Sequence, residues 1–230
     1  MKFKSPVYSQ ASGSIAGITY SHNRGGMYTR QRVVPTNPAS EYQSAVRSYV
    51  AALVAAWSSV LSDAQRAAWD LYAESVELPD TLGDTRNVGG VGMYVRSNVP
   101  RLQAGLTRVD DGPTVFSLPE VANIALASAS EASQELSVTF LNTDDWAGED
   151  GAALLVYVSR PANPGVNFFK GPYRLAAVIE GDSGTPPTSP TAVTAPFAIT
   201  AAQKVFAKFN ITRADGRYSS PFRAGVVIGS

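Results

Sequence analysis

Hydrophobic and polar positions follow three different patterns along the chain. Up to about residue 37, short β-prone pieces alternate with glycines and form no long apolar stripe. Over 38–114, apolar residues recur at three- and four-residue steps, which is the period of helices packed on one face. Over 115–230, short runs alternate with period two between turn residues, as in half-buried strands. The pattern predicts an α+β protein with an N-terminal arm over 1–37, a helical module over 38–114 and a β domain over 115–230.

The helical module carries the clearest local signals. Thr36-Asn37-Pro38 offers an N-cap followed by a first-turn proline. Ser62-Asp63-Ala64-Gln65 is a capping box that begins a second helix, which runs to about Ser75. Helices joined this closely fold back as an αα-hairpin, and we expect Trp57 and Trp69 in its core. The apolar stripe of the first helix consists of Tyr42, Val46, Tyr49, Val50, Leu53, Trp57 and Val60.

A third helix is predicted from about Val91 to Ala104. Gly105 follows it as a natural C-terminal cap, since glycine adopts the left-handed conformation without strain. Pro100 lies inside the segment and predicts a kink or a break.

About seven short strands are predicted after residue 115. Asp215-Gly216 is a hairpin turn signal, and Gly181–Pro190 reads as a long polar loop. This spacing of strands and turns is typical of an immunoglobulin- or fibronectin-like antiparallel β-sandwich. The expected strands lie near 123–127, 136–140, 152–158, 173–180, 197–200, 205–211 and 218–228.

Composition narrows the function classes. The chain has 230 residues, 19 basic and 19 acidic, with one histidine and no cysteine. The absence of cysteine excludes disulfides, thiolate metal sites and cysteine nucleophiles. A net charge of zero argues against a dedicated nucleic-acid-binding protein. No apolar run approaches the roughly 20 residues of a membrane span, and no leader pattern is visible, so we expect a soluble protein made in the cytoplasm.

Motifs for catalysis are largely missing. His22 is the one imidazole, and no G-x-S-x-G elbow accompanies it, so neither a serine triad nor a histidine zinc site is expected. Gly89-Gly90-Val91-Gly92 lacks the spacing of a phosphate-binding loop and indicates a turn or a close-packed helix start. The acidic cluster of Asp144, Asp145, Glu149 and Asp150 is a candidate calcium site, although solvated loop charges are the simpler interpretation. We predict no catalytic residue, no cofactor and no enzymatic activity.

Charge is unevenly spread. Residues 1–32 hold five basic residues and no acidic one, while the remainder holds 14 basic and 19 acidic residues. The glycine-rich arm cannot build a core alone, so we expect an extended arm or loose hairpin that packs on its own chain or reaches a neighbouring subunit. Its basic and aromatic residues suit an acidic protein surface better than nucleic acid, because five charges over 32 residues are sparse. The candidate partner-binding residues are Arg24, Tyr28, Arg30 and Arg32.

An ordered series of short blocks extends over about residues 9–106. The blocks are Ser12–Gly17, Asn23–Arg30, Pro35–Ser40, Leu61–Trp69, Gly92–Asn98 and Arg101–Gly105, with Gln43, Arg47 and Trp57 between them. This series resembles a family of short structural proteins encoded in tailed-phage and prophage genomes. The resemblance implies a virion component and carries over no catalytic residue.

The sequence thus predicts a non-enzymatic virion protein, first of all a capsid decoration protein that attaches through its arm. A neck or tail component is the alternative within that class. The partners would be other virion proteins and further copies of the chain, with no membrane and no nucleic acid. A carbohydrate- or receptor-binding module is the alternative from another class, with aromatic residues of the sandwich loops as the binding surface. These aromatic residues are Trp146, Phe168, Phe169 and Tyr173.

Overall fold

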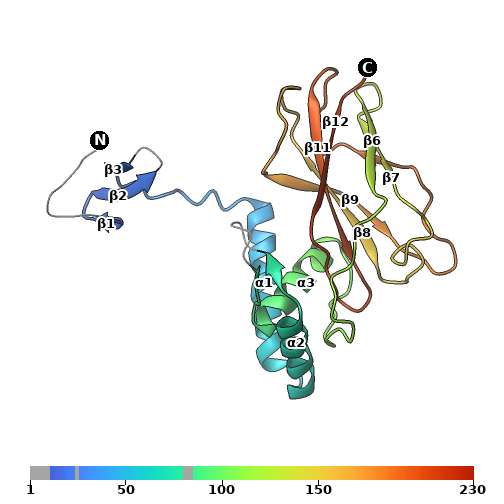
Figure 1. The fold of residues 1–230 in the computed structure, drawn as a ribbon, viewed down its shortest axis with the longest axis horizontal. Coiled ribbons are helices and arrows are strands. Elements are labelled where there is room, and N and C mark those ends of the chain that lie inside the picture. Colours follow the sequence, from blue (N-terminus) through green and yellow to red (C-terminus); the bar gives the residue numbers. More distant parts are fainter. Residues whose placement is uncertain (1–10, 24–25, 80–84) are drawn as a thin grey trace. The chain divides into compact units, whose positions relative to one another are not determined.

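The computed structural model describes residues 11–23, 26–79 and 85–230. It divides into two compact units, Met1–Gln43 and Ser44–Ser230. Figure 1 shows the elements along the chain and labels most of them. The helices are α1 (Glu41–Ser59), α2 (Asp63–Ser75) and α3 (Gly90–Gln103). The strands are β1 (Gly13–Ile15), β2 (Ile18–Asn23), β3 (Gly26–Gln31), β4 (Leu78–Pro79), β5 (Thr85–Arg86), β6 (Ala125–Ser130), β7 (Glu135–Thr139), β8 (Ala153–Ser159), β9 (Tyr173–Glu180), β10 (Thr191–Thr194), β11 (Lys204–Thr212) and β12 (Phe222–Val227).

The N-terminal unit is a three-stranded antiparallel sheet in the order β1-β2-β3. Of the two predicted forms, an extended arm and a loose hairpin, residues 13–31 take the hairpin form, because the short β-prone pieces pair with one another. A tight turn at Ala16, which has a φ of 50°, joins the first two strands. The Arg32 N–H extends the ladder by donating to the Gly17 carbonyl at 2.9 Å. No described residue of this unit is buried, so the sheet has backbone pairing without a core.

Helix α1 begins later than predicted. The side-chain oxygen of Asn37 accepts the Ala39 N–H at 3.2 Å, and Ala39 has a φ of 44°. This local turn competes with the helix, so the predicted N-cap at Thr36–Pro38 is wrong. The helix starts after Ser40, whose hydroxyl accepts the Gln43 N–H at 3.4 Å.

The predicted capping box of α2 is present. The Ser62 hydroxyl accepts the Gln65 N–H at 3.3 Å, and the Gln65 side-chain oxygen accepts the Ser62 N–H at 2.9 Å. Leu53 and Ala56 of α1 belong to the same buried cluster as residues of α2 and α3, so the helices share one core. Trp69 is fully buried at the centre of this cluster, as predicted. The other buried members are Leu61, Tyr72, Ala73, Val76, Met93 and Tyr94, and Trp57 packs against them while partly exposed.

Helix α3 continues through Pro100 to Gln103, so the predicted break does not occur. The proline removes one N–H donor, but the last turn is closed by the Ala104 N–H, which donates to the Pro100 and Arg101 carbonyls at 3.0 and 3.1 Å. Gly105 has a φ of +79°, as predicted for the residue after the helix. Among the described residues, we find no helix with the length and apolar character required to cross a membrane.

Within the described stretch 115–230, seven strands form two antiparallel sheets. One sheet has the order β10-β7-β6 and the other β12-β11-β8-β9. A parallel bridge between Ser130 and Gly229 links the end of the chain to β6. The predicted strand at 197–200 is wrong: β10 lies at Thr191–Thr194, where Val193 pairs with Leu136 and is buried. Phe197 instead lies beneath two guanidinium groups.

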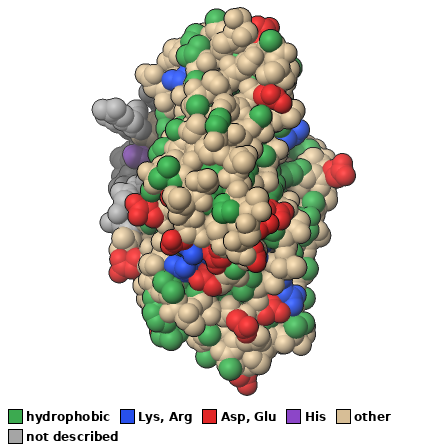
Figure 2. Space-filling view, turned by 90° about the vertical axis from the view of Figure 1, so that its right-hand side faces the viewer, with side chains coloured by type: hydrophobic (Ala, Val, Ile, Leu, Met, Phe, Trp, Pro, Cys, Tyr) green, Lys and Arg blue, Asp and Glu red, His purple; other side chains and the backbone are tan. Residues whose placement is uncertain are grey.

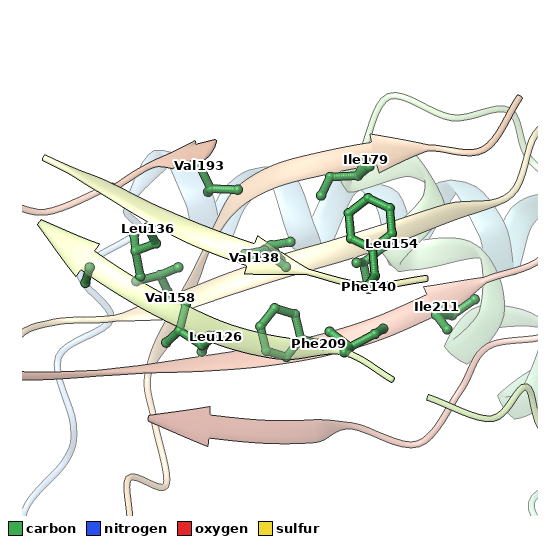
Figure 3. Packing of buried hydrophobic residues seen from close by; sticks show 14 of the residues in the cluster. Leu126, Leu136, Val138, Phe140, Leu154, Val158, Ile179, Val193, Phe209 and Ile211 are labelled. Carbon is green, nitrogen blue, oxygen red and sulfur yellow. The ribbon is translucent and has the colours of Figure 1, made fainter. Parts of the chain in front are cut away.

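The inner faces of the two sheets share one hydrophobic core. Figure 3 shows side chains from both sheets pointing toward one another, among them Val138, Leu154 and Phe209. Strand β8 is buried on both faces, because Leu155 and Tyr157 point away from this core into a second cluster. Leu106 and Tyr218 cover that second cluster. The chain after α3 therefore covers part of the outer face of the four-stranded sheet.

Arginines join the helices to the sheet within the second unit. Arg101 is 2% exposed and donates to the Thr212 hydroxyl at 3.1 Å and to the Arg213 carbonyl at 2.8 Å. Burial lowers the pKa of its guanidinium. Arg96 donates to the Tyr218 carbonyl at 2.8 Å. Apart from β1 to β3 and the first three residues of α1, which lie in the first unit, the helices and strands belong to one compact unit, and a domain boundary near residue 115 stays a prediction.

Candidate functional site

The N-terminal sheet has two chemically different faces. Residues directly opposite in an antiparallel pair share a face, and faces alternate along each strand. Ile15 pairs with Ile18, and His22 pairs with Met27, so these four residues share one face. Hydroxyl groups occupy the other face, where the Ser14 and Thr19 hydroxyls lie 2.8 Å apart. The face of Ile15 also carries Tyr20, Thr29 and Gln31, so the sheet is amphipathic chiefly through Ile15, Ile18 and Met27, and none of its described residues is buried.

The predicted partner-binding residues are only partly brought together. Tyr28 and Arg30 lie two residues apart on β3 and point to the hydroxyl face, opposite Ser21 and Thr19. Arg32 follows the strand and is exposed, and Arg24 lies outside the described residues. Two of the four predicted residues thus share one face, and a third continues from the same strand.

The apolar face is the feature that the sequence prediction missed. Ile15 is 73% exposed and Ile18 is 46% exposed. Both side chains lie on the face that also carries Met27. The alternation of Ile18 and Tyr20 with polar residues is the sequence signal for this face. The prediction for this segment rests on its charge and glycine content instead.

The remaining sequence candidates for catalysis have structural explanations. His22 is exposed on β2. The glycines at the start of α3 allow a close approach to α2, because the Gly90 N–H donates to the Asp70 carboxylate at 3.1 Å and a Cβ at Gly90 would lie 2.1 Å from that oxygen. The close-packed helix start predicted for this glycine run is confirmed.

The acidic cluster is organised around a basic residue. Arg213 pairs with Glu149 and, at 3.6 Å, with Asp145. The Asp150 carboxylate accepts the Ser183 N–H and hydroxyl, at 2.8 and 2.9 Å, and these bonds lower its pKa. Figure 2 shows acidic side chains gathered around a few basic ones midway along the face that it presents. Within the described part of the chain, no three acidic or histidine side chains are placed to hold a metal ion, which counts against the calcium interpretation.

The four aromatic residues considered for sugar binding separate into two places. Trp146 is 2% exposed and packs against Phe140 with ring centroids 5.2 Å apart, so its predicted role in sugar binding is wrong. Phe168, Phe169 and Tyr173 instead line a pocket of about 160 Å³ at the outer face of the four-stranded sheet. Its other lining residues are Asn167, Lys204, Phe206, Arg223, Ala224 and Gly225.

Aromatic contacts hold one side of this pocket in place. The Phe169 ring stacks on Phe206 with centroids 5.8 Å apart and meets the edge of Tyr173 at 5.3 Å. The Tyr173 hydroxyl donates to the Phe169 carbonyl at 2.8 Å. Phe168 stands next to this anchored residue and is 67% exposed. The pocket therefore combines buried Phe206 and the half-buried rings of Phe169 and Tyr173 with one solvent-facing ring.

Basic groups accompany the aromatic rings. The Lys204 ammonium lies 5.2 Å from the centre of the Phe206 ring, and Arg223 is exposed at the rim. The Lys208 ammonium lies 4.0 Å from the centre of the Tyr157 ring, and burial, with the nearby Arg223, lowers its pKa. The described residues that line the pocket include no carboxylate.

Comparisons with known proteins give little guidance. No protein-family model matches the sequence, and no curated protein matches it. Among solved structures, the chain is similar to the adhesin domain of Epf from Streptococcus pyogenes, at 15% identity and a TM-score of 0.30. The match covers 46% of this chain and 33% of the chain of the adhesin-domain structure. At this TM-score the similarity supports no inference about function.

Proposed function

We propose that the protein is a non-enzymatic structural component of a bacteriophage virion, in the first place a capsid decoration protein that attaches through its N-terminal unit. The observation that carries the proposal is the amphipathic sheet β1-β2-β3, which exposes an apolar face and buries none of its described residues. The resemblance of residues 9–106 to phage structural proteins supports it. A neck or tail position is the alternative within the same class.

The apolar face of the sheet supplies a driving force for attachment. Covering a largely exposed isoleucine side chain contributes about 1.5–3 kcal/mol. Ile15 and Ile18 together therefore provide several kcal/mol if a partner surface covers both. Contacts of this size are weak singly, but repeated copies on a lattice combine them into firm attachment.

The distribution of charge also supports attachment through the N-terminal unit. The N-terminal unit carries five basic residues and Glu41, a net charge of +4, while residues 44–230 carry 14 basic and 18 acidic residues, a net charge of −4. Arg32 is exposed directly after β3, and Arg30 is exposed on the opposite, hydroxyl face of the sheet. The partner surface would then be an apolar patch with an acidic rim, on another virion protein or on a further copy of the chain.

We also propose that residues 115–230 form an immunoglobulin- or fibronectin-like sandwich. Lettered in chain order as A, B, C, C′, E, F and G, the strands β6 to β12 give one sheet of order E-B-A and another of order G-F-C-C′. Immunoglobulin-like domains divide their strands in this manner. The shared core of the two inner faces supports the assignment. Such a domain would lie on the surface of the particle. The chain would be made in the host cytoplasm and carried on the virion.

The direct test is the composition of particles purified from the phage or induced prophage that encodes the chain. Mass spectrometry and electron cryomicroscopy should find the chain in regular copies. Ile18→Lys, which places a charge on the apolar face, should reduce the copies per particle about tenfold or more, because the variant loses the burial of one isoleucine.

Thr19→Lys is the matched control, because its side chain lies on the opposite face of the same strand. It should leave the copy number close to that of the parent. Absence of the chain from purified particles would overturn the virion proposal. Equal incorporation of both variants would show that the apolar face is not the attachment surface.

A second candidate function is a carbohydrate- or receptor-binding module. The pocket lined by Phe168, Phe169 and Tyr173 favours it, since aromatic rings stack on sugar rings through their faces. The two functions are compatible, because the pocket lies in the second unit and the proposed attachment surface in the first. Retention of sugar by the parent and its loss in Phe168→Ala would support the module, and failure of the parent to bind any sugar would refute it.

A further inference from the structure

The aromatic pocket carries a more specific chemistry than sugar binding in general. We propose that it binds a single six-membered sugar ring that bears a carboxylate, such as a uronic acid residue of a polysaccharide. This inference rests on the second candidate function above. It identifies the ligand class from the size of the pocket, its rings and its cations.

The size of the pocket sets the size of the ligand. Its volume is about 160 Å³. A cavity of about 150 Å³ in another protein takes one benzene-sized ring, so this pocket has room for one six-membered ring. A longer glycan would extend from it into solvent, past the exposed side chain of Phe168.

The aromatic side of the pocket is arranged before any ligand arrives. Phe169 is held between Phe206 and Tyr173 by ring contacts and by the hydrogen bond from the Tyr173 hydroxyl. Gly225 is part of this arrangement, because a Cβ there would lie 2.8 Å from the Phe206 ring. A ring surface that is already ordered loses little conformational entropy on binding. The exposed Phe168 ring adds a face on which a sugar ring can stack.

The charges around the pocket select an anion. Lys204 and Arg223 line it, and none of the described residues that line it is acidic. The Lys208 ammonium lies 6.0 Å from the centre of the Tyr173 ring and adds a third positive charge near the pocket. An arginine guanidinium can donate two parallel hydrogen bonds to a carboxylate. The cations thus recognise the acid group while the rings hold the sugar.

The test uses matched pairs of sugars that differ only in the carboxylate. D-Glucuronate against D-glucose, and D-galacturonate against D-galactose, are titrated into the full-length protein and followed by two-dimensional NMR. Each acidic sugar should bind about tenfold more tightly than its neutral counterpart at low salt, because it gains a charge-assisted contact. Arg223→Gln should reduce this ratio to about threefold or less. High salt should also reduce the ratio, because it screens the charges.

Phe168→Ala should weaken binding of acidic and neutral sugars alike, and the 67% exposure of this side chain means that folding is not at risk. Phe116→Ala and Arg86→Gln are the matched controls, because both side chains are exposed and neither lines the pocket. These controls should leave every affinity unchanged. Benzoate is a further probe, which carries a carboxylate on a flat aromatic ring.

The outcomes separate the two levels of the proposal. Equal binding of acidic and neutral sugars would overturn the carboxylate inference and leave the carbohydrate module standing. No binding of any of the four sugars would overturn both. Binding of benzoate as tight as that of the uronates, with no binding of glucose or galactose, would show that the pocket takes aromatic acids instead of sugars.

Discussion

Replacement of Arg101 by methionine tests how the helices are joined to the sheet. The guanidinium donates to three acceptors, the Thr107 carbonyl at 2.9 Å, the Thr212 hydroxyl at 3.1 Å and the Arg213 carbonyl at 2.8 Å. Methionine keeps an unbranched apolar side chain in the space but provides no donor. Arg101→Met therefore removes the polar link between α3 and β11 while leaving most of the packing in place.

The expected loss of stability follows from the three acceptors. A part-buried acceptor that loses its donor costs about 1 kcal/mol, so the three together cost about 3 kcal/mol. The desolvation of the guanidinium, which lowers the pKa of Arg101, disappears in the variant and reduces the net loss to about 2 kcal/mol. We expect the free energy of unfolding of Arg101→Met to be lower than that of the parent by this amount.

Urea unfolding followed by tryptophan fluorescence and circular dichroism measures the change. Trp57 and Trp69 report on the helices and Trp146 reports on the core between the sheets. Arg86→Met is the control, because Arg86 is exposed, and its effect should stay within about 0.5 kcal/mol. An Arg101→Met loss no larger than that of the control would refute the assigned role of this buried arginine.

Three further predictions concern local features. Ser62→Ala removes the capping box of α2 and should lower the free energy of unfolding by about 1 kcal/mol in the same urea assay; an unchanged midpoint would count against the cap. Gly181→Ala places a Cβ 2.0 Å from the Trp146 carbonyl oxygen, so it should unfold at a clearly lower temperature in calorimetry, and a variant with the parental melting temperature would contradict this contact. The Arg108 guanidinium lowers the pKa of the Asp110 carboxyl below 3.8, so this pair stabilises the fold above that pH and the stabilisation is lost as the pH falls through the folded-state pKa. Asp110→Asn should therefore show a smaller drop in urea midpoint than the parent between about pH 5 and pH 2, and an identical drop would exclude the Asp110 carboxyl as its source.

Local sequence signals predicted the elements whose bonds are local. The capping box at Ser62 needs only residues three apart, and it forms where the sequence places it. Gly105 after α3 likewise has the left-handed conformation that glycine allows. The predicted start of α1 was wrong because Asn37 and Ala39 close a competing turn through one side-chain hydrogen bond.

Long-range pairing explains the errors among the strands. β10 at Thr191–Thr194 follows a polar, proline-rich passage, and it becomes a strand because Val193 pairs with Leu136, 57 residues away in sequence from it. Phe197, the residue that suggested a strand at 197–200, packs under guanidinium groups instead. Such partners are not visible in a local pattern, since β-propensity depends mainly on the neighbours in the sheet.

The candidate site was also predicted only in part from the sequence. The sequence identified Phe168, Phe169 and Tyr173 as aromatic candidates, but it could not show that Trp146 is buried. Lys204 lies on β11 and Arg223 lies on β12. Both side chains reach these rings only because the register of this strand pair places them on the same outer face of the sheet. The cationic character of the pocket is thus a property of strand register.

The sequence by itself determined the α+β composition, the helical module with its capping box and the uneven distribution of charge. These depend on periodicity, on residues a few positions apart and on counts along the chain. Only the tertiary structure decided that the N-terminal segment is an amphipathic sheet, that β8 is buried on both faces and that aromatic and basic residues meet in one pocket. The physical reason is that each of these features depends on which strands pair and in what register, and a shift of one residue would move every side chain to the opposite face.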